Sequence, residues 1–515
     1  MMKKRLAVFG MDGSRLDVVK KWVDIGYLPT IKKIIEKGVS GEIKSLLPGP
    51  HSFSAWTSFA TGTNPGKHGL CYPVVPDFKN QKLQFINSTH IKNKKIWNYL
   101  SEDGKVVGIM DLPILYPVEP LNGIMVSSWG TPALESEYTY PGDIKHIMDN
   151  FEAGTIANCY ERSNQALNNL YRATNQKFNS IKWFFNNYDW DFFANDFIEP
   201  ELLHHLYSPY LDITHEQYNP NYETIIRDYY IKMDKFFAEI LQMYPELNII
   251  IMSDHGHCAN KEYVYVNNIL AKYDFFYKSK INVSQKNKVY HGIIKQLTNL
   301  YLQIPISVKK EFNKLIPKFF ADKVKHKKTL DINWDKSIAF CLQLGMVYIN
   351  RSYGDIQNGK ISVEDTTHKV FEALKNDEIM KTKVRGLYLK KDLFNGQNQD
   401  TLPDIVIDFY DDYKINTGTP ENIFSEKIKS NQPTSHTMDA MFLAYGPEFK
   451  EGLKIKGRSI MDIMPTIMHF FNLHIPKEVD GVIMKEIFKK FEDNKIKVKG
   501  REELILNQAI KGVRI

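Results

Sequence analysis

The stretch Leu247-Asn-Ile-Ile-Ile-Met-Ser-Asp-His-Gly-His257 decides how the rest of the chain is interpreted. Its apolar run, which has no alternation, is typical of a strand buried on both faces, as in a parallel sheet with helices on either side. Asp254 and His255 follow the last apolar residue, Met252. Ligands of open α/β sheets gather at the carboxyl ends of the strands, so a carboxylate beside an imidazole indicates a divalent metal there. The alternative is that Asp-His-Gly forms an ordinary polar turn.

The composition is that of a large globular protein. A length of 515 residues predicts a large domain with an insertion, or two lobes. The 43% hydrophobic content excludes disorder, and a net charge of +7 is modest for this length, so no nucleic-acid partner is expected. The four cysteines lack CxxC spacing, which indicates neither a disulfide framework nor a thiolate zinc site. Without a signal-peptide core or a bilayer-spanning run, a cytoplasmic location is expected.

A second strand near the N-terminus ends in the same way as the first. Arg5 to Gly10 form a short apolar run, and Met11-Asp-Gly-Ser14 is the turn that follows. Asp12 is therefore expected at the same sheet edge as Asp254. The alternative role for Asp12 is a helix cap, which aspartates commonly provide.

A serine follows a segment that cannot be regular structure. Pro48-Gly-Pro50 prevents a helix before His51, and a helix is predicted to begin at about residues 52–54. Ser52 would then face the unpaired amides and the positive dipole end of that helix, where a phosphate binds well. Its alternative role is an N-cap. A bound metal would favour the catalytic role, because coordination lowers the pKa of a hydroxyl enough to make it a nucleophile.

These motifs together resemble the type I phosphodiesterase/nucleotide pyrophosphatase branch of the alkaline phosphatase superfamily, in its bacterial form. The resemblance rests on motifs in a fixed order, which span nearly the whole chain: Gly10-Met-Asp-Gly13, Ala55-Trp-Thr-Ser-Phe-Ala-Thr-Gly-Thr-Asn-Pro-Gly-Lys-His-Gly69, Ser253-Asp-His-Gly256, Asn333-Trp-Asp-Lys-Ser-Ile-Ala339, Met346-Val-Tyr-Ile-Asn350, Ser435-His436, Met441-Phe-Leu-Ala-Tyr-Gly-Pro447, Ser459-Ile-Met-Asp-Ile-Met-Pro-Thr466 and Val479-Asp-Gly481.

The resemblance implies two divalent metals, usually zinc, with manganese as a competitor. By position, the first metal would be held by Asp12, Ser52, Asp254 and His255, with Ser52 as the nucleophile in place of the usual threonine. The second would be held by Glu201, His205 and His436. Pro200 suits the first turn of a helix, so Glu201 and His205, four residues apart, would share one face of it.

Two ambiguities and one departure accompany this ligand set. Glutamate replaces the usual aspartate at position 201, so Glu199 is an alternative ligand, and His204 is an alternative to His205. The family's nucleotide pyrophosphatases carry an asparagine after the His-Gly motif that hydrogen-bonds the phosphoryl oxygen. This chain has Pro73 at that spacing, and proline has no donor. Stabilisation of the transition state would then fall to the metals and to the amides near Ser52.

The predicted fold is α/β, a doubly wound, mostly parallel sheet of the alkaline phosphatase type with an inserted cap. We expect a core of residues 1–270 and 403–490, a cap of residues 271–402 and a charged tail of residues 491–515. The strands at 403–408 and 441–445 are expected in the core sheet. The cap includes a Lys-rich amphipathic segment around residues 277–328. This segment is either a solvated helix or a surface for a polyanionic substrate or for peripheral contact with an anionic membrane.

The predicted activity is hydrolysis of a phosphodiester or pyrophosphate bond in a small phosphorylated substrate, through a phosphoserine at a two-metal site. Three superfamily neighbours are excluded, because the sulfatase, phosphoglycerate mutase and alkaline phosphomonoesterase motifs are absent around Ser52. The alternatives are a phosphomonoesterase or phosphonate hydrolase of the same superfamily, and a non-catalytic relative that binds a phosphorylated ligand. The sequence identifies neither the leaving group nor the oligomeric state.

Overall fold

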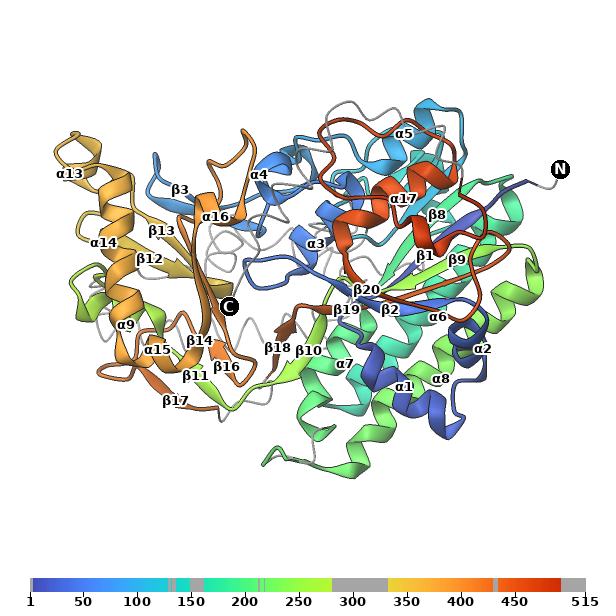
Figure 1. The fold of residues 1–515 in the computed structure, drawn as a ribbon, viewed down its shortest axis with the longest axis horizontal. Helices are drawn as coiled ribbons and strands as arrows, with labels where there is room; N and C mark the ends of the chain where they lie inside the picture. Colours follow the sequence, from blue (N-terminus) through green and yellow to red (C-terminus); the bar gives the residue numbers. More distant parts are fainter. Residues whose placement is uncertain are drawn as a thin grey trace, which may run out of the picture.

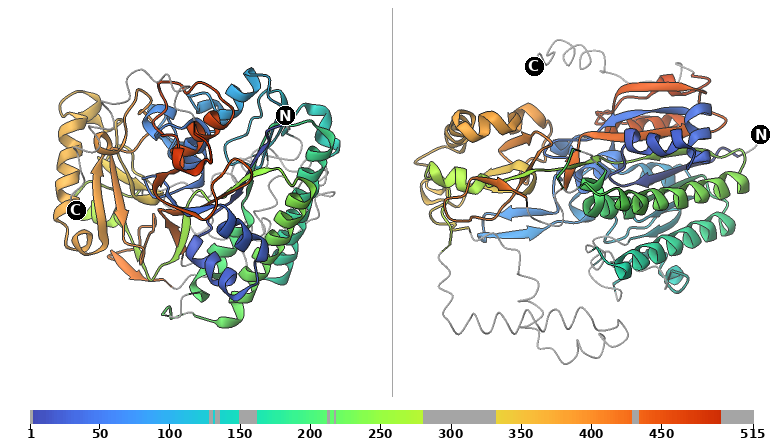
Figure 2. Two further views of the ribbon diagram at one scale, coloured as in Figure 1. Left: turned by 45° about the vertical axis from the view of Figure 1, so that its right-hand side comes forward. Right: turned by 90° about the horizontal axis from the view of Figure 1, so that it is seen from below.

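The structure is a computed structural model, and it describes residues 3–127, 131, 136–148, 162–211, 214–216, 218–279, 332–428 and 434–491. The described residues form two lobes that lie side by side (Figure 1, Figure 2). The larger lobe is built on a nine-stranded sheet, and the smaller lobe on a four-stranded one.

The nine-stranded sheet is mostly parallel in its centre. β1 pairs in parallel with β8 and β9, and β5 pairs in parallel with β8 and β6. The antiparallel pairs are those that β19 makes with β2 and β9, and that of β6 with β7. In spatial order the strands are β20 (Leu453–Ser459), β2 (Val39–Lys44), β19 (Asp439–Tyr445), β9 (Asn248–Met252), β1 (Leu6–Met11), β8 (Phe192–Phe197), β5 (Val107–Met110), β6 (Gly123–Val126) and β7 (Thr139–Tyr140).

Helices cover both faces of this sheet, which confirms the predicted doubly wound α/β fold. Successive side chains of a strand point to opposite faces. Accordingly, Leu6 and Val8 of β1 pack into one apolar cluster, and Ala7, Phe9 and Met11 into the other. The first cluster includes residues of α3 (Ser52–Thr61), α5 (Ile96–Glu102) and α17 (Ile463–Phe470), and the second those of α1 (Leu16–Ile25), α2 (Pro29–Lys37), α6 (Asn164–Asn187), α7 (Glu199–Tyr207) and α8 (Pro220–Met243).

The smaller lobe has its own antiparallel sheet and apolar cluster. Its strands lie in the order β12 (Ala339–Leu342), β13 (Met346–Ile349), β15 (Ile405–Phe409) and β14 (Val384–Leu389). They pack with α9 (Val266–Lys272), α14 (Val363–Asn376) and α15 (Glu378–Lys383). The expectation that residues 403–408 join the core sheet is therefore wrong, because β15 pairs with β13 and β14. Residues 441–445 do lie in the core sheet, within β19. How the chain divides into domains remains a prediction.

Three short sheets accompany the two larger ones in the described part of the chain. β10 (Gly256–Ala259) pairs antiparallel with β18 (Thr434–Thr437), and both lie between the lobes in Figure 1. β11 (Glu262–Val264) pairs with β16 (Tyr413–Ile415) and β17 (Ser425–Lys427), and β3 (Val74–Asp77) pairs with β4 (Lys82–Phe85).

The lobes are joined by hydrogen bonds to the chain just after α3. The Thr401 hydroxyl donates to the Gly69 carbonyl at 2.8 Å, and the Asn398 amide donates to the Lys67 carbonyl at 2.6 Å. The smaller lobe is thus fastened next to the helix that begins at Ser52.

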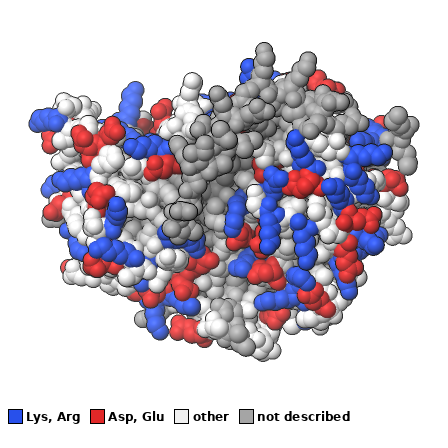
Figure 3. Space-filling view, viewed as in Figure 1, with Lys and Arg blue, Asp and Glu red and all other residues white. Residues whose placement is uncertain are grey.

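On the face shown in Figure 3, Lys and Arg side chains are interspersed with Asp and Glu over both lobes. Among the described residues, no helix combines the length and the apolar character needed to cross a bilayer. Most of the predicted Lys-rich segment, and nearly all of the predicted tail, lie outside the described residues.

Candidate metal centre

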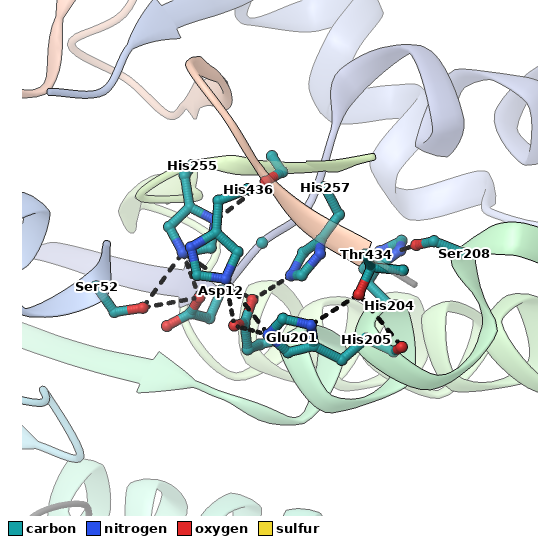
Figure 4. A network of polar contacts seen from close by, with 12 residues as sticks. Asp12, Ser52, Glu201, His204, His205, Ser208, His255, His257, Thr434 and His436 are labelled. Atoms are coloured by element: carbon teal, nitrogen blue, oxygen red, sulfur yellow. Dashed lines mark hydrogen bonds and ion pairs between the residues drawn. The ribbon is translucent and has the colours of Figure 1, made fainter. Parts of the chain in front are cut away.

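The ends of three neighbouring parallel strands meet at one edge of the central sheet. Met11 of β1 lies beside Phe197 of β8, and Gly10 lies beside Met252 of β9. The residues that follow each strand are therefore brought together, as expected at the carboxyl edge of such a sheet. Asp12 follows β1, the Asp254–His255 pair follows β9, and α7 with Glu201 and His205 follows β8. Figure 4 shows the side chains of Asp12, His255 and Glu201 converging, with His205 beside them.

The four residues predicted for the first metal are all placed together. Ser52, the first residue of α3, has its Oγ 3.4 Å from Asp12 Oδ1 and 3.3 Å from His255 Nε2. His255 Nε2 also lies 3.5 Å from Asp12 Oδ1 and 3.3 Å from Asp254 Oδ2. All four side chains are buried. Asp12, Asp254 and His255 each offer an atom within 4.8 Å of the others, which is compact enough for one ion.

The three residues predicted for the second metal form a tight triangle. Glu201 Oε1 lies 2.8 Å from His205 Nε2 and 3.0 Å from His436 Nε2, and the two nitrogens are 3.3 Å apart. Neighbouring ligands of a tetrahedral ion with bonds of about 2.0 Å are about 3.3 Å apart, so only a small expansion would be needed. His436 reaches this place because β18 pairs with β10.

The three predicted histidine ligands each use one ring nitrogen in a hydrogen bond and turn the other toward the centre. The Nδ1 atoms of His255 and His436 lie 3.1 Å from the Gly256 carbonyl and 2.7 Å from the Pro50 carbonyl. His205 Nδ1 lies 2.9 Å from the Thr434 hydroxyl, which itself donates to the His205 carbonyl. Because the acceptors fix the proton on Nδ1, all three Nε2 lone pairs face the carboxylates, as in histidines that bind metals.

The structure directs the two alternative ligands elsewhere. Glu199 faces the buried ammonium of Lys177, with Oε1 3.0 Å from Nζ. His204 has both nitrogens occupied, Nδ1 by the Ser208 hydroxyl at 3.2 Å and Nε2 by the Tyr230 hydroxyl at 2.9 Å. These contacts favour Glu201 and His205 as the ligands.

The buried charges at this centre fit bound cations. Asp12 Oδ2 and Asp254 Oδ2 are buried and have no hydrogen-bond partner among the described residues. Burial and the charge on Glu201 raise the pKa of Asp254 to about 6, and burial followed by the charge on Asp254 raises that of Asp12 well above its usual value. Burial lowers the pKa of His255 to about 3, which leaves a neutral imidazole. Uncompensated carboxylates beside imidazole nitrogens are a donor set suited to a divalent transition metal.

One further histidine lies at this centre that the sequence analysis did not select. His257 is buried, and its Nε2 contacts Glu201 Oε2. Glu201, His255, His257 and His436 each offer an atom within 4.8 Å of the others. The sequence did contain a signal for His257, which is its spacing from His255. Side chains two residues apart in an extended chain lie on the same face.

Comparisons with known proteins show the family and the fold of this chain. A family model described as type I phosphodiesterase/nucleotide pyrophosphatase matches residues 6–427. The solved structure of human ectonucleotide pyrophosphatase/phosphodiesterase 5 has a TM-score of 0.53 at 14% identity, covering 95% of this chain and 100% of that one. An inactive variant of the murine protein in complex with AMP has a TM-score of 0.50 at 13% identity, covering 92% and 96%. Among curated proteins, no significant match was found.

Proposed function

Since the chain belongs to the type I phosphodiesterase/nucleotide pyrophosphatase family, we propose that this hydrolase cleaves a phosphodiester or pyrophosphate bond through a phosphoserine at Ser52. The observation that carries the proposal is the place of the Ser52 hydroxyl. It lies within 3.4 Å of Asp12 and His255, at the first residue of a ten-residue helix. A hydroxyl at that position lies between the carboxylates of the candidate metal centre and the positive end of the helix dipole.

The proposed cofactors are two divalent ions, zinc first and manganese as the competitor. Asp12, Ser52, Asp254 and His255 would hold one ion, and Glu201, His205 and His436 the other. When bound, the ions supply the positive charge that lowers the pKa of a hydroxyl group or water and neutralises the charge of a phosphoryl group.

The chain's own residues then define two displacements at phosphorus. In the first, Ser52 Oγ gives up its proton and bonds to phosphorus while the bond from phosphorus to the leaving oxygen breaks; the leaving oxygen takes up a proton, and Ser52 is left phosphorylated. In the second, water gives up a proton and bonds to phosphorus while the bond to Ser52 Oγ breaks; Ser52 Oγ takes up a proton, which restores the serine and releases the phosphorylated product. Helix α3 holds Ser52 in place, because His51 Nδ1 accepts a hydrogen bond from the Phe53 amide at 3.1 Å and caps the helix.

The substrate is proposed to be a small phosphorylated compound, of the size of the AMP bound by the murine relative. The ligand residues at the core strand ends recognise only the phosphoryl group, so selection of the leaving group is assigned to the smaller lobe. Pro73 stands where the asparagine of nucleotide pyrophosphatases is expected, so we leave nucleotides as one class among several.

The test compares Ser52→Ala and Ser52→Thr in metal-replete protein. Alanine removes the nucleophile, and turnover of bis-(para-nitrophenyl) phosphate should fall about 1,000-fold or more. Threonine keeps the hydroxyl, and turnover should remain within about tenfold of wild type. Acid-quenched wild-type protein should carry a phosphoryl group on the peptide that contains Ser52.

Two results would count against the proposal. Wild-type turnover in Ser52→Ala would exclude the covalent mechanism. A strong preference for para-nitrophenyl phosphate over the diester would show that the enzyme is a phosphomonoesterase and not a phosphodiesterase.

A further inference from the structure

We propose that His257 is a positioning residue that holds one oxygen of Glu201, so that the other oxygen faces the metal shared with His205 and His436; this role rests on the proposed metal centre. The starting observation is how the two oxygens of Glu201 divide their contacts. Oε1 lies 2.8 Å from His205 Nε2 and 3.0 Å from His436 Nε2. Oε2 contacts His257 Nε2 instead and lies 4.0 Å from His255 Nε2. Figure 4 shows the His257 ring directed at Glu201.

The position of the proton on His257 supports donation rather than metal ligation. His257 Nδ1 is buried and has no hydrogen-bond partner among the described residues. A neutral imidazole carries its proton on one nitrogen only. A proton on Nδ1 would leave a buried donor unpaired, which is costly, whereas a proton on Nε2 is donated to Glu201 Oε2. In this respect His257 differs from His205, His255 and His436, whose Nδ1 atoms all have acceptors.

The surroundings of His257 hold its ring in this orientation. His257 lies directly across the β10–β18 pair from His436, which places both side chains on one face. Its ring stacks on His204, with centroids 5.6 Å apart and planes at 16°, and meets His205 edge-on, with centroids 4.5 Å apart.

A glycine makes room for the pair of His257 and Glu201. A Cβ at Gly13 would lie 2.5 Å from His257 Cδ2 and 2.7 Å from Glu201 Oε2. Gly13 also has a φ of +71°, which side chains rarely adopt. The turn after β1 therefore accommodates both Asp12 and the contact between His257 and Glu201.

A glutamate needs such a partner more than an aspartate does. Its side chain has one more rotatable bond, and an unrestrained carboxylate has two equivalent oxygens to offer to a metal. A hydrogen bond to one oxygen fixes the rotamer and leaves a single oxygen for coordination. Partners of this kind raise the affinity of metal sites about 10- to 100-fold.

The experiment compares His257→Gln, which keeps an N–H donor, with His257→Phe, which keeps the ring volume without a donor. Zinc affinity is measured by competition with a chromophoric chelator, and the visible absorption of the cobalt-loaded protein reports the ligand set. His257→Phe should weaken binding of one of two zinc ions about 10- to 100-fold. His257→Gln should retain most of the affinity and the wild-type cobalt spectrum.

The matched control is His68→Gln, a buried imidazole whose two nitrogens contact the Ser58 hydroxyl and the Leu70 amide instead of Glu201. Its zinc affinity should equal that of wild type, and circular dichroism of each metal-free variant establishes that it folds. An equal loss in both His257 variants with an altered cobalt spectrum would make His257 a ligand and overturn the proposal. No loss in either would also overturn it. Failure of wild type itself to bind two metals would refute the proposed function, a separate outcome.

Discussion

Asp254 shows what burial does to a single side chain in this protein. Its Oδ1 accepts hydrogen bonds from the Gly13 amide at 3.3 Å and the His255 amide at 3.0 Å, whereas Oδ2 has no hydrogen-bond partner among the described residues. The carboxylate is therefore held in place but not neutralised. A group in this state lowers stability without a metal and becomes a strong ligand with one.

The buried charge of Asp254 predicts how the stability of the metal-free protein changes with pH. The pKa of Asp254 rises from 3.8 to about 6 on folding, so between these values the folded state holds a proton that the unfolded state has released. The contribution of Asp254 to the free energy of unfolding therefore falls as pH rises through this window. Asp254→Asn removes the penalty, and the metal-free variant should be more stable than metal-free wild type at pH 8 by about 1–3 kcal/mol. At pH 4 the two should differ little.

Urea unfolding of the metal-free proteins at both pH values measures this difference. The control is Asp24→Asn, an exposed carboxylate on α1 paired with Lys20, whose profile should follow that of wild type. A metal-free Asp254→Asn protein no more stable than wild type at pH 8 would contradict the account.

At the scale of single residues, the motifs predicted seven side chains that the structure brings together. They could not predict the neighbours that favour Glu201 over Glu199 and His205 over His204, because these neighbours come from distant parts of the chain. Lys177, which forms an ion pair with Glu199, lies on α6. Tyr230, which forms a hydrogen bond with His204, lies on α8. His257 was missed because the motif that contains Asp254 and His255 ends at Gly256.

At the scale of elements, helix α7 carries two proposed ligands and is anchored at its first turn. Lys177 Nζ of α6 lies 3.0 Å from Glu199 Oε1 and 3.5 Å from Asp111 Oδ2, and all three side chains are at most 7% exposed. Asp111 follows β5, so the ammonium links α6, α7 and a strand end. The position of Glu201, two residues after Glu199, depends on this link.

Replacing Lys177 with Met should therefore destabilise the protein strongly. The substitution keeps the length of the side chain but leaves two buried carboxylates without their cation, at a cost of about 3–5 kcal/mol. Lys182→Met is the control on the same helix, because Lys182 pairs with Glu239 at 2.9 Å where the two side chains are 32% and 56% exposed. The loss in the free energy of unfolding of Lys182→Met should stay below about 1 kcal/mol. Urea unfolding at pH 7 compares the two, and equal losses would refute the anchoring role.

The strands also show what the pattern of apolar residues in a sequence does not predict. An apolar run predicts a strand but does not say which sheet the strand joins. Residues 403–408 and 441–445 look alike in sequence, yet β15 enters the smaller lobe and β19 the central sheet. The difference lies in pairing partners far along the chain, which one sequence does not reveal.

At the scale of the whole molecule, we propose that the two lobes have separate tasks. The edge of the central sheet gathers most of the proposed ligands, and the smaller lobe lies beside them. Leu344 of the smaller lobe would lie 3.0 Å from a Cβ at Gly49, three residues before Ser52. The sequence predicted a doubly wound core with an insertion, because strand ends and motifs follow one another in order. It could not predict the surface that the smaller lobe presents to a substrate, because loops and long-range packing define that surface.

The central claim is that one chain holds two divalent ions, one in each ligand group, and elemental analysis tests it most directly. Zinc-loaded, desalted wild type should contain two ions per chain. Asp254→Asn should lose the ion of the first group and His436→Ala that of the second, so that each retains one. Wild type with fewer than one tightly bound ion, and no recovery on adding zinc or manganese, would contradict the account and favour a protein that only binds phosphorylated ligands.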